Sequence, residues 1–174
     1  MTHAHKNRCV LRLSAFAVFF GLALACSAGG DVVVYNHSPS MQIGFYARIA
    51  APIRRGTIVT VRAAAVAPEY ARMRHFNGPR DRFIKRVVGT SGDLVCAAQS
   101  RVMLNGALVA HRQNSDSLGR RLPTWTGCIT LGAGDVFLLG DGPDSFDGRY
   151  WGVVRMDQIE GVWRPLLVKS ADAL

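Results

Sequence analysis

The sequence predicts a mainly β domain, an irregular β-barrel-like fold, preceded by one N-terminal apolar helix. After Gly30, short runs rich in β-branched and aromatic residues recur between glycine, aspartate, asparagine and serine, which is typical of strands joined by turns. Before that point, residues 13–30 form an uncharged run of 18 residues. As a helix this run is about 27 Å long, just enough for a membrane core. We therefore expect two parts, residues 1–30 and residues 31–174.

The N-terminal part has the features of an export signal. Lys6, Arg8 and Arg12 precede the apolar run, and positive charge keeps that end in the cytoplasm, so residues after Gly30 are expected to face outward. The run is either an uncleaved anchor or a signal peptide with an A-x-A cleavage site at residues 23–25. In both cases we expect the second part in the periplasm, at the inner membrane or anchored in it.

The composition excludes a disordered chain and gives little support to nucleic-acid binding. The 174 residues are 49% hydrophobic and 19% charged, as in an ordinary folded domain. The net charge is +9, and it falls to 9 − 3 = +6 without the three cations before Gly30. Such an excess permits contact with nucleic acid or anionic lipid. There is no RNA-binding or zinc-finger motif, so no nucleic-acid partner is expected.

The predicted strands after Gly30 are short and closely spaced. Within residues 102–108, the pair Asn105-Gly106 predicts a tight hairpin. One short helix is expected to begin near Pro68 and to end at the Asn-Gly-Pro sequence of residues 77–79. The polar residues 111–124 predict an exposed loop. The strands are expected at residues 31–35, 56–61, 83–88, 93–96, 102–108, 135–139, 150–154 and 161–168.

The four cysteines divide between the two parts of the chain. Cys9 and Cys26 lie in the N-terminal part, and Cys96 and Cys128 in the second part. Because an oxidising compartment favours pairing, we expect a Cys96–Cys128 disulfide, the alternative being two buried free thiols. There is no C-x-x-C motif, so a structural zinc site is not expected. No other metal and no cofactor are expected either.

Residues 36–46, N-H-S-P-S-M-Q-I-G-F-Y, form either a surface turn or a serine nucleophile near a membrane. A serine needs a base to take its proton. The chain has no G-x-S-x-G, H-E-x-x-H or S-x-x-K motif. His37 lies three residues before Ser40, but no acid in the sequence obviously orients it. The remaining histidines lie before the apolar run or in polar, loop-like stretches.

Lys85 is the better candidate base. It lies in the predicted strand D-R-F-I-K-R-V-V-G, where alternation places Phe83, Lys85 and Val87 on one face. Burial on an apolar face lowers the pKa of a lysine, as a general base requires, whereas an arginine would stay charged. The alternative is a lysine that extends to solvent from the rim of the domain.

Three stretches in this order resemble the bacterial type I signal peptidase family, whose members use a Ser–Lys dyad. They are S-P-S-M-Q-I-G-F-Y, R-F-I-K-R-V-V-G-T-S-G-D and L-L-G-D-G-P-D-S-F-D-G-R-Y-W-G. The short chain and the S-x-x-x-G-x-Y form of the first stretch are similar to the conjugative-transfer, TraF-type branch. The resemblance spans roughly residues 32–165. It implies the signal-peptidase catalytic fold for the second part.

The resemblance assigns chemical roles to four residues. It makes Ser40 the nucleophile and Lys85 its general base. It implies an oxyanion hole formed by the main-chain N–H of Ser40 and the hydroxyl of Ser38. Ser145, in D-S-F-D-G-R, matches the serine that orients the lysine amine.

The resemblance assigns supporting roles to five further residues. Asp147 and Arg149 match an acid–base pair that braces the site. Asp141 matches the aspartate of the family's G-D-N motif, and Gly44 and Tyr46 match the G-x-Y that shapes the chain after the nucleophile.

This chain departs from the family pattern at two positions. Gln42 stands where the conjugative branch usually has proline, and Gly142 stands where the G-D-N motif has asparagine. The loop before Ser145 is also one residue shorter than in leader peptidases. These departures leave the dyad intact and leave open the substrate groove and the role of Asp141.

The resemblance implies a serine endopeptidase that cleaves an exported precursor at the inner membrane. The precursor expected is a conjugative pilin, matured by hydrolysis or by cyclisation, and mating-pair formation proteins are further expected partners. Alternatives are a general type I signal peptidase and a non-catalytic scaffold of a pilus or secretion apparatus. A LexA-like self-cleaving regulator does not fit, because the chain has an export signal and no DNA-binding part.

Overall fold

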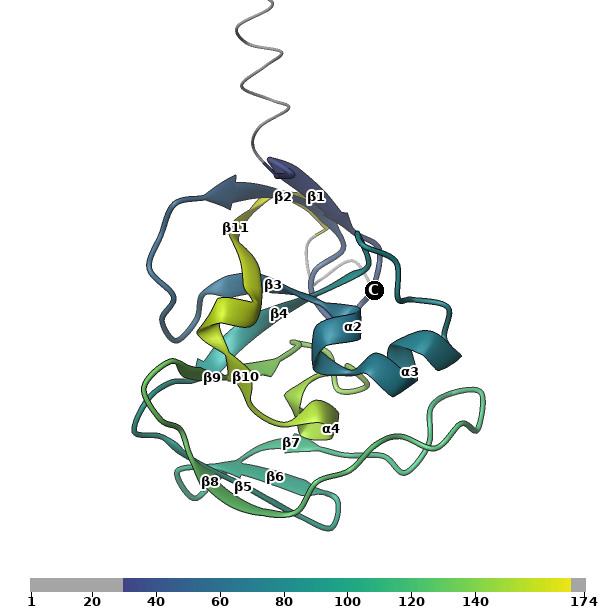
Figure 1. The fold of residues 1–174 in the computed structure, drawn as a ribbon, viewed down its shortest axis with the longest axis vertical. Helices are drawn as coiled ribbons and strands as arrows, with labels where there is room; N and C mark the ends of the chain where they lie inside the picture. The colour runs from purple at the N-terminus through teal and green to yellow at the C-terminus, as the bar shows by residue number, and fades with distance from the viewer. Residues whose placement is uncertain (1–29, 170–174) are drawn as a thin grey trace, which may run out of the picture. The chain divides into compact units, whose positions relative to one another are not determined.

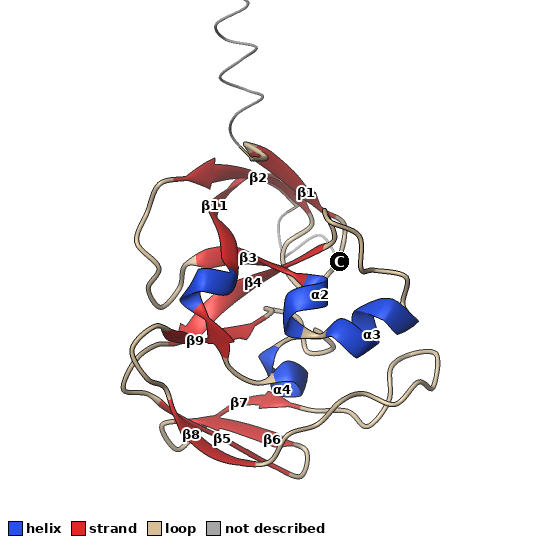
Figure 2. Cartoon of the chain, viewed as in Figure 1, coloured by secondary structure: helices blue, strands red, loops and turns tan. Residues whose placement is uncertain are grey.

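The computed structural model describes residues 30–169 and confirms a mainly β fold. Residues 33–169 belong to one unit, in which two antiparallel sheets carry short helices (Figures 1 and 2). The predicted N-terminal helix, its cleavage site, Cys9 and Cys26 lie outside the described residues. Among residues 30–169, no helix has the length and apolar character needed to span a membrane.

The larger sheet has seven strands in the order β1-β2-β11-β3-β4-β9-β10, and every neighbouring pair is antiparallel. It is open at both edges, so within residues 30–169 the larger sheet does not close into a barrel. Its strands are β1 (Val33–Asn36), β2 (Gly44–Ile49), β3 (Ile58–Arg62), β4 (Arg82–Gly89), β9 (Asp135–Leu139), β10 (Val154–Arg155) and β11 (Ile159–Val168).

The smaller sheet is an insertion between β4 and β9. Its order is β7-β6-β5-β8, with β5 (Leu94–Ala98), β6 (Arg101–Leu104), β7 (Ala107–His111) and β8 (Gly127–Thr130). The predicted hairpin at Asn105-Gly106 joins β6 to β7. Both residues have positive φ, 51° and 82°, as expected of a two-residue turn that matches the strand twist.

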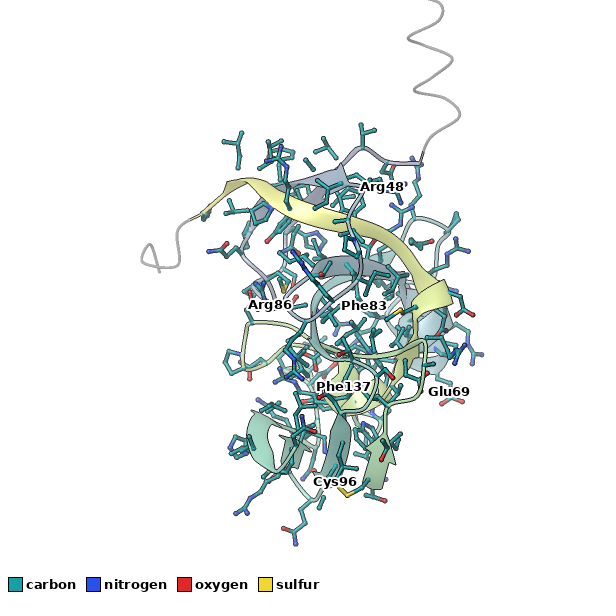
Figure 3. All side chains as sticks on the ribbon, turned by 90° about the vertical axis from the view of Figure 1, so that its left-hand side faces the viewer. Arg48, Glu69, Phe83, Arg86, Cys96 and Phe137 are labelled. Carbon is teal, nitrogen blue, oxygen red and sulfur yellow. A yellow bond between two sulfur atoms is a disulfide. The ribbon has the colours of Figure 1, made fainter. Side chains whose placement is uncertain are left out.

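Strand β9 contributes side chains to both hydrophobic cores, because both of its faces are buried. Val136 and Leu138 pack with apolar residues of β3 and β4. Phe137 and Leu139 pack with residues of β5, β6 and β7 on the other side. Figure 3 shows Phe137 between Phe83 of β4 and Cys96 of the smaller sheet. Residues of alternating direction on one strand thus build two separate cores.

The helix predicted to begin near Pro68 is α3 (Pro68–Met73), and a further helix that was not predicted, α2 (Ala63–Val66), precedes it. Ala67 separates them with φ −147°, because a residue before proline is disfavoured in the helical conformation. Helix α3 ends earlier than predicted, at Met73, and His75, with φ 53°, follows its C-cap. There the Phe76 N–H donates to the Ala71 carbonyl and the His75 N–H to the Arg72 carbonyl, a Schellman cap without glycine.

The predicted strand at residues 150–154 is wrong for most of its length. These residues include the end of α4 (Gly148–Trp151) and the start of the two-residue strand β10. Asp147 caps α4 by accepting the Arg149 N–H, and Gly152, with φ 84°, ends it. A short 3-10 turn, η1 (Met156–Gln158), then leads into β11.

Two strands, β2 and β8, were not predicted, and the predicted loop at residues 111–124 is only partly exposed. Strand β8 has no buried residue, so it carries no apolar alternation to detect. In the loop, Arg112 and Leu122 are buried. Arg112 donates to the carbonyls of Gln99 and Trp125, which satisfies its guanidinium inside the domain.

Candidate active site

A tight turn between β1 and β2 presents Ser40. The side chain of Asn36, which is buried, holds this turn together. Its Nδ2 donates to the carbonyls of Ser38, Met41 and Gln42 at 2.8, 3.1 and 3.1 Å, and its Oδ1 accepts the Ser38 N–H at 3.2 Å. Asn36 was not among the predicted site residues, although it begins the stretch of residues 36–46 and asparagine often hydrogen-bonds to nearby backbone in turns.

Gly44 and Tyr46 fix the chain after this turn. Gly44 has φ 146°, and a Cβ there would lie 2.2 Å from the carbonyl oxygen of Leu167 on β11, so only glycine fits. The Tyr46 hydroxyl donates to the Gln42 carbonyl at 2.6 Å. Burial raises the pKa of Tyr46 above its ordinary value, so this hydroxyl keeps its proton and remains a donor.

Ser40 is 9% exposed and lies within reach of two other polar groups. The Ser38 hydroxyl donates to Ser40 Oγ at 3.2 Å, and the Ser40 N–H donates to Ser38 Oγ at 3.3 Å. The two serines therefore bring one N–H and two hydroxyls into a small volume.

Lys85 lies on β4 and is only 2% exposed, so the alternative of a lysine extending to solvent is wrong. Its Nζ donates to Ser40 Oγ at 2.8 Å. In the sheet it is opposite the fully buried Val59, and its Nζ lies 5.8 Å from the centre of the Phe83 ring. Two residues 45 positions apart in the chain thus form a buried hydrogen bond.

Burial lowers the pKa of Lys85 from 10.5 to about 8. Among the charges, Asp147 acts next and raises this pKa, Arg149 lowers it, and Asp141 raises it. An amine with this pKa is neutral in a useful fraction of molecules near neutral pH, when it can accept a proton from a hydroxyl.

Asp147, at the end of the loop after β9, and Arg149, in α4, form a buried ion pair, and their side chains are 0% and 4% exposed. Arg149 Nε and Nη2 donate to the two carboxylate oxygens at 2.8 and 3.0 Å. Asp147 also accepts the Gly140 N–H at 2.7 Å, and Arg149 donates to the carbonyls of Gly142 and Pro143. The pair therefore ties together both ends of the loop.

Asp141 lies on the exposed side of the same loop and pairs with Arg86. Arg86 Nε and Nη2 donate to its two oxygens at 2.8 and 2.7 Å. This bond raises the pKa of Arg86 further above its ordinary value. Arg86 was not among the predicted site residues. Strand alternation could have indicated it, because Arg86 follows Lys85 and its side chain is expected on the opposite face of the strand.

Ser145 lies in this loop but is not joined to Lys85. Its hydroxyl is buried and has no hydrogen-bond partner among the described residues. A Cβ placed on Gly140 would meet Ser145 Oγ at 2.2 Å and the Ser40 carbonyl oxygen at 2.6 Å. Ser145 and Ser40 therefore approach the same glycine, while the expected hydrogen bond from Ser145 to the lysine amine is not formed in this structure.

Cys96 and Cys128 form a disulfide between β5 and β8. Figure 3 shows Cys96 at one end of the domain, well separated from Arg86, which follows Lys85. The disulfide thus joins an edge strand of the smaller sheet and lies outside the cluster around Ser40. Within residues 30–169, no group of three or more histidine, cysteine or acidic side chains is placed to hold a metal ion.

Comparisons with known proteins agree with the three sequence motifs. A family model described as "Signal peptidase, peptidase S26" matches residues 6–167. Two Escherichia coli proteins named plasmid transfer protein TraF are 32% and 30% identical to the chain. These alignments cover 90% and 92% of the chain, and 96% and 98% of the relatives.

A solved signal peptidase I from Enterococcus faecalis V583 is 24% identical to the chain. The match covers 66% of this chain and 98% of that one, at a TM-score of 0.39. That score is too low to strengthen the assignment, which rests on the sequence matches.

The family predicted from the motifs is therefore confirmed: the chain belongs to the signal peptidase family, peptidase S26.

Proposed function

We propose that Ser40 and Lys85 form the catalytic dyad of a serine endopeptidase that cleaves exported precursors. The observation that carries this proposal is the 2.8 Å hydrogen bond between Lys85 Nζ and Ser40 Oγ, made by a lysine that is 2% exposed. The lowered pKa of Lys85, about 8, supports it, because the amine must be neutral to act as a base.

In the proposed reaction, the neutral Lys85 amine takes the proton from Ser40 Oγ as this oxygen attacks the substrate carbonyl carbon. The resulting ammonium gives its proton to the leaving amine when the peptide bond breaks. Water, deprotonated by the same amine, then attacks the acyl-enzyme ester and releases Ser40. The proton of Ser40 leaves with the amine product, and a proton from water, passed through the Lys85 amine, replaces it on Ser40. Both groups of the dyad are thereby regenerated without a cofactor.

The charge on the carbonyl oxygen would be stabilised by the Ser40 N–H and the Ser38 hydroxyl. The two groups lie next to each other in the structure, where the Ser40 N–H donates to Ser38 Oγ at 3.3 Å. Rotation of the Ser38 hydroxyl toward substrate would free both donors for the oxyanion. We assign Ser145 the role of orienting the Lys85 amine by a hydrogen bond during the cycle, since its buried hydroxyl has no hydrogen-bond partner among the described residues.

We place the reaction at the outer surface of the inner membrane. The strands on each side of the Ser40 turn carry exposed apolar side chains, among them Val33, Tyr35 and Phe45, and Leu167 of β11 lies opposite Phe45. The Tyr35 and Phe45 rings are in contact, with centroids 4.9 Å apart. Apolar surface next to the nucleophile suits a substrate that emerges from a bilayer.

The proposed substrate is the pilin precursor of a conjugative plasmid. This proposal rests on the plasmid transfer proteins named TraF, which match nearly their whole length. Hydrolysis leaves a free carboxyl end, and attack by the pilin's own amino group on the acyl-enzyme leaves a cyclic product. Both products come from the same Ser40 ester. We further propose that proteins of mating-pair formation are partners of this peptidase and use the mature pilin.

The test is the mass of a co-expressed conjugative pilin precursor in cells with wild-type protein, Ser40→Ala or Lys85→Ala. We expect a shortened pilin with the wild type and the intact precursor with both variants. Ser91→Ala and Lys169→Ala are matched controls, because both residues are exposed, and they should process like the wild type. Processing by Ser40→Ala or Lys85→Ala would exclude the dyad and favour a scaffold.

A panel of ordinary secreted precursors separates the proposed substrate from a general one. Cleavage restricted to the pilin supports a dedicated conjugative peptidase. Cleavage of many precursors by the wild type, but not by Ser40→Ala, keeps the dyad and makes the protein a general signal peptidase.

A further inference from the structure

Gly142 replaces the asparagine of the family motif, and its surroundings leave no room for a side chain. A Cβ at this position would lie 2.8 Å from the carbonyl oxygen of Pro39 and 3.5 Å from the Cα of Ser40. Both contacts are with backbone, which cannot rotate away as a side chain end would. The φ of Gly142 is outside the left-handed region, so close approach, not backbone conformation, requires glycine here.

The backbone of Gly142 connects the buried ion pair to the turn that carries Ser40. Its N–H donates to the Ser40 carbonyl at 3.3 Å. Its own carbonyl accepts from Arg149 Nη2 at 3.2 Å and from the Ser145 N–H at 3.3 Å. Arg149 is in turn held by Asp147. Gly142 therefore lies between a fixed charge pair and the main chain of Ser40.

We propose that Gly142 is a positioning residue that sets the distance between Ser40 Oγ and Lys85 Nζ. Because it has no side chain, the loop after β9 lies directly against Pro39 and Ser40, and its N–H holds the Ser40 carbonyl. A side chain at residue 142 pushes the Ser40 turn away, while Lys85 stays fixed on β4. This inference rests on the proposed dyad for its effect on rate, and on the geometry alone for its effect on structure.

The kinetic test uses Gly142→Ala and Gly142→Asn with an internally quenched peptide that contains Ala-x-Ala, presented with phospholipid vesicles. We expect kcat to fall about 10- to 100-fold and KM to change less than about threefold, because displacement of a nucleophile by about an ångström slows the reaction without removing substrate contacts. Gly142→Asn should be at least as slow as Gly142→Ala, although it restores the family's residue.

Gly132→Ala is the matched control. Gly132 also has a φ outside the left-handed region, and its Cβ would meet only the carboxylate end of Asp135, at 3.2 Å. It should keep the kcat of the wild type. Wild-type kcat in Gly142→Ala, an equal loss in Gly132→Ala, or a loss expressed only in KM would each overturn the proposal.

Two measurements test the geometry without peptidase activity. In the wild type, the Gly142 amide should exchange its hydrogen more slowly than the exposed amides nearby, because it is hydrogen-bonded to the Ser40 carbonyl. Exchange at the rate of those exposed amides would overturn the proposal, and this test does not depend on whether Gly142→Ala folds.

In a crystal structure of Gly142→Ala, the distance from Lys85 Nζ to Ser40 Oγ should exceed 2.8 Å. A distance unchanged from the wild type would contradict the positioning role. An inactive wild type with both geometric results intact would refute the peptidase proposal and leave the role of Gly142 standing.

Discussion

Two ion pairs hold the loop after β9, and they differ mainly in burial. Asp147 and Arg149 have side chains that are 0% and 4% exposed, whereas those of Asp141 and Arg86 are 41% and 36% exposed. Both are two-pronged arginine–carboxylate pairs of similar length. Water screens the outer pair and not the inner one, so equal geometry does not imply equal energy.

The inner pair does more than attract two charges. Asp147 accepts one N–H of the loop, and Arg149 donates to two of its carbonyls. These hydrogen bonds satisfy backbone groups that a regular helix or strand would satisfy through its own backbone. The two charges also act in opposite directions on Lys85, since Asp147 raises its pKa and Arg149 lowers it. Because they oppose each other, burial remains the main cause of the lowered pKa, and the lysine can be neutral beside an aspartate.

Removal of one partner of the inner pair should give the largest effect. Arg149→Met leaves the Asp147 carboxylate buried without its cation, and we expect the free energy of unfolding to fall by about 3–5 kcal/mol. Urea unfolding followed by circular dichroism measures this change. Arg155→Met is the control, because Arg155 is 60% exposed in its pair with Asp135; a loss below about 1 kcal/mol is expected there. Equal losses in the two variants would mean that burial does not distinguish these pairs.

Removal of the outer pair should give a small effect. We expect Asp141→Asn to lower the free energy of unfolding by less than about 1 kcal/mol, and the difference from wild type to shrink in high salt. Because Asp141 raises the pKa of Lys85, the same variant should lower that pKa slightly. The pH dependence of peptide cleavage would then shift to lower pH. If the free energy of unfolding fell as much as in Arg149→Met, the exposed Asp141 would contribute as much to stability as the buried pair, and the comparison by burial would be wrong.

The sequence was sufficient to predict the mainly β fold, because β-branched alternation and turn residues mark most strands. Alternation in R-F-I-K-R-V-V also placed Lys85 on an apolar face, and it is buried there. Helix α4 was mistaken for a strand because Tyr150, Trp151 and Val153 are residues typical of strands. The segment is helical because the Asp147 carboxylate caps its N-terminal end and Gly152, with φ 84°, ends it.

The contacts of the site depend on tertiary structure and were less predictable. The motifs suggested which residues belong together, but not that Asn36 would hold the Ser40 turn with three carbonyl contacts. The Arg86–Asp141 pair joins residues 55 positions apart. The close approach of Gly142 to Pro39 likewise brings together two loops that no local pattern relates. Such distances are set by the packing of whole strands.

The pH dependence of kcat/KM tests the proposed dyad most directly, since this quantity reports the ionisation of the free enzyme. Burial lowers the pKa of Lys85 to about 8, and only the neutral amine can accept the Ser40 proton. Cleavage of the quenched peptide should therefore rise about tenfold per pH unit below about pH 8 and level off above it. A profile that is already flat at about pH 7, or that bends near the ordinary histidine pKa of about 6.5, would contradict Lys85 as the base.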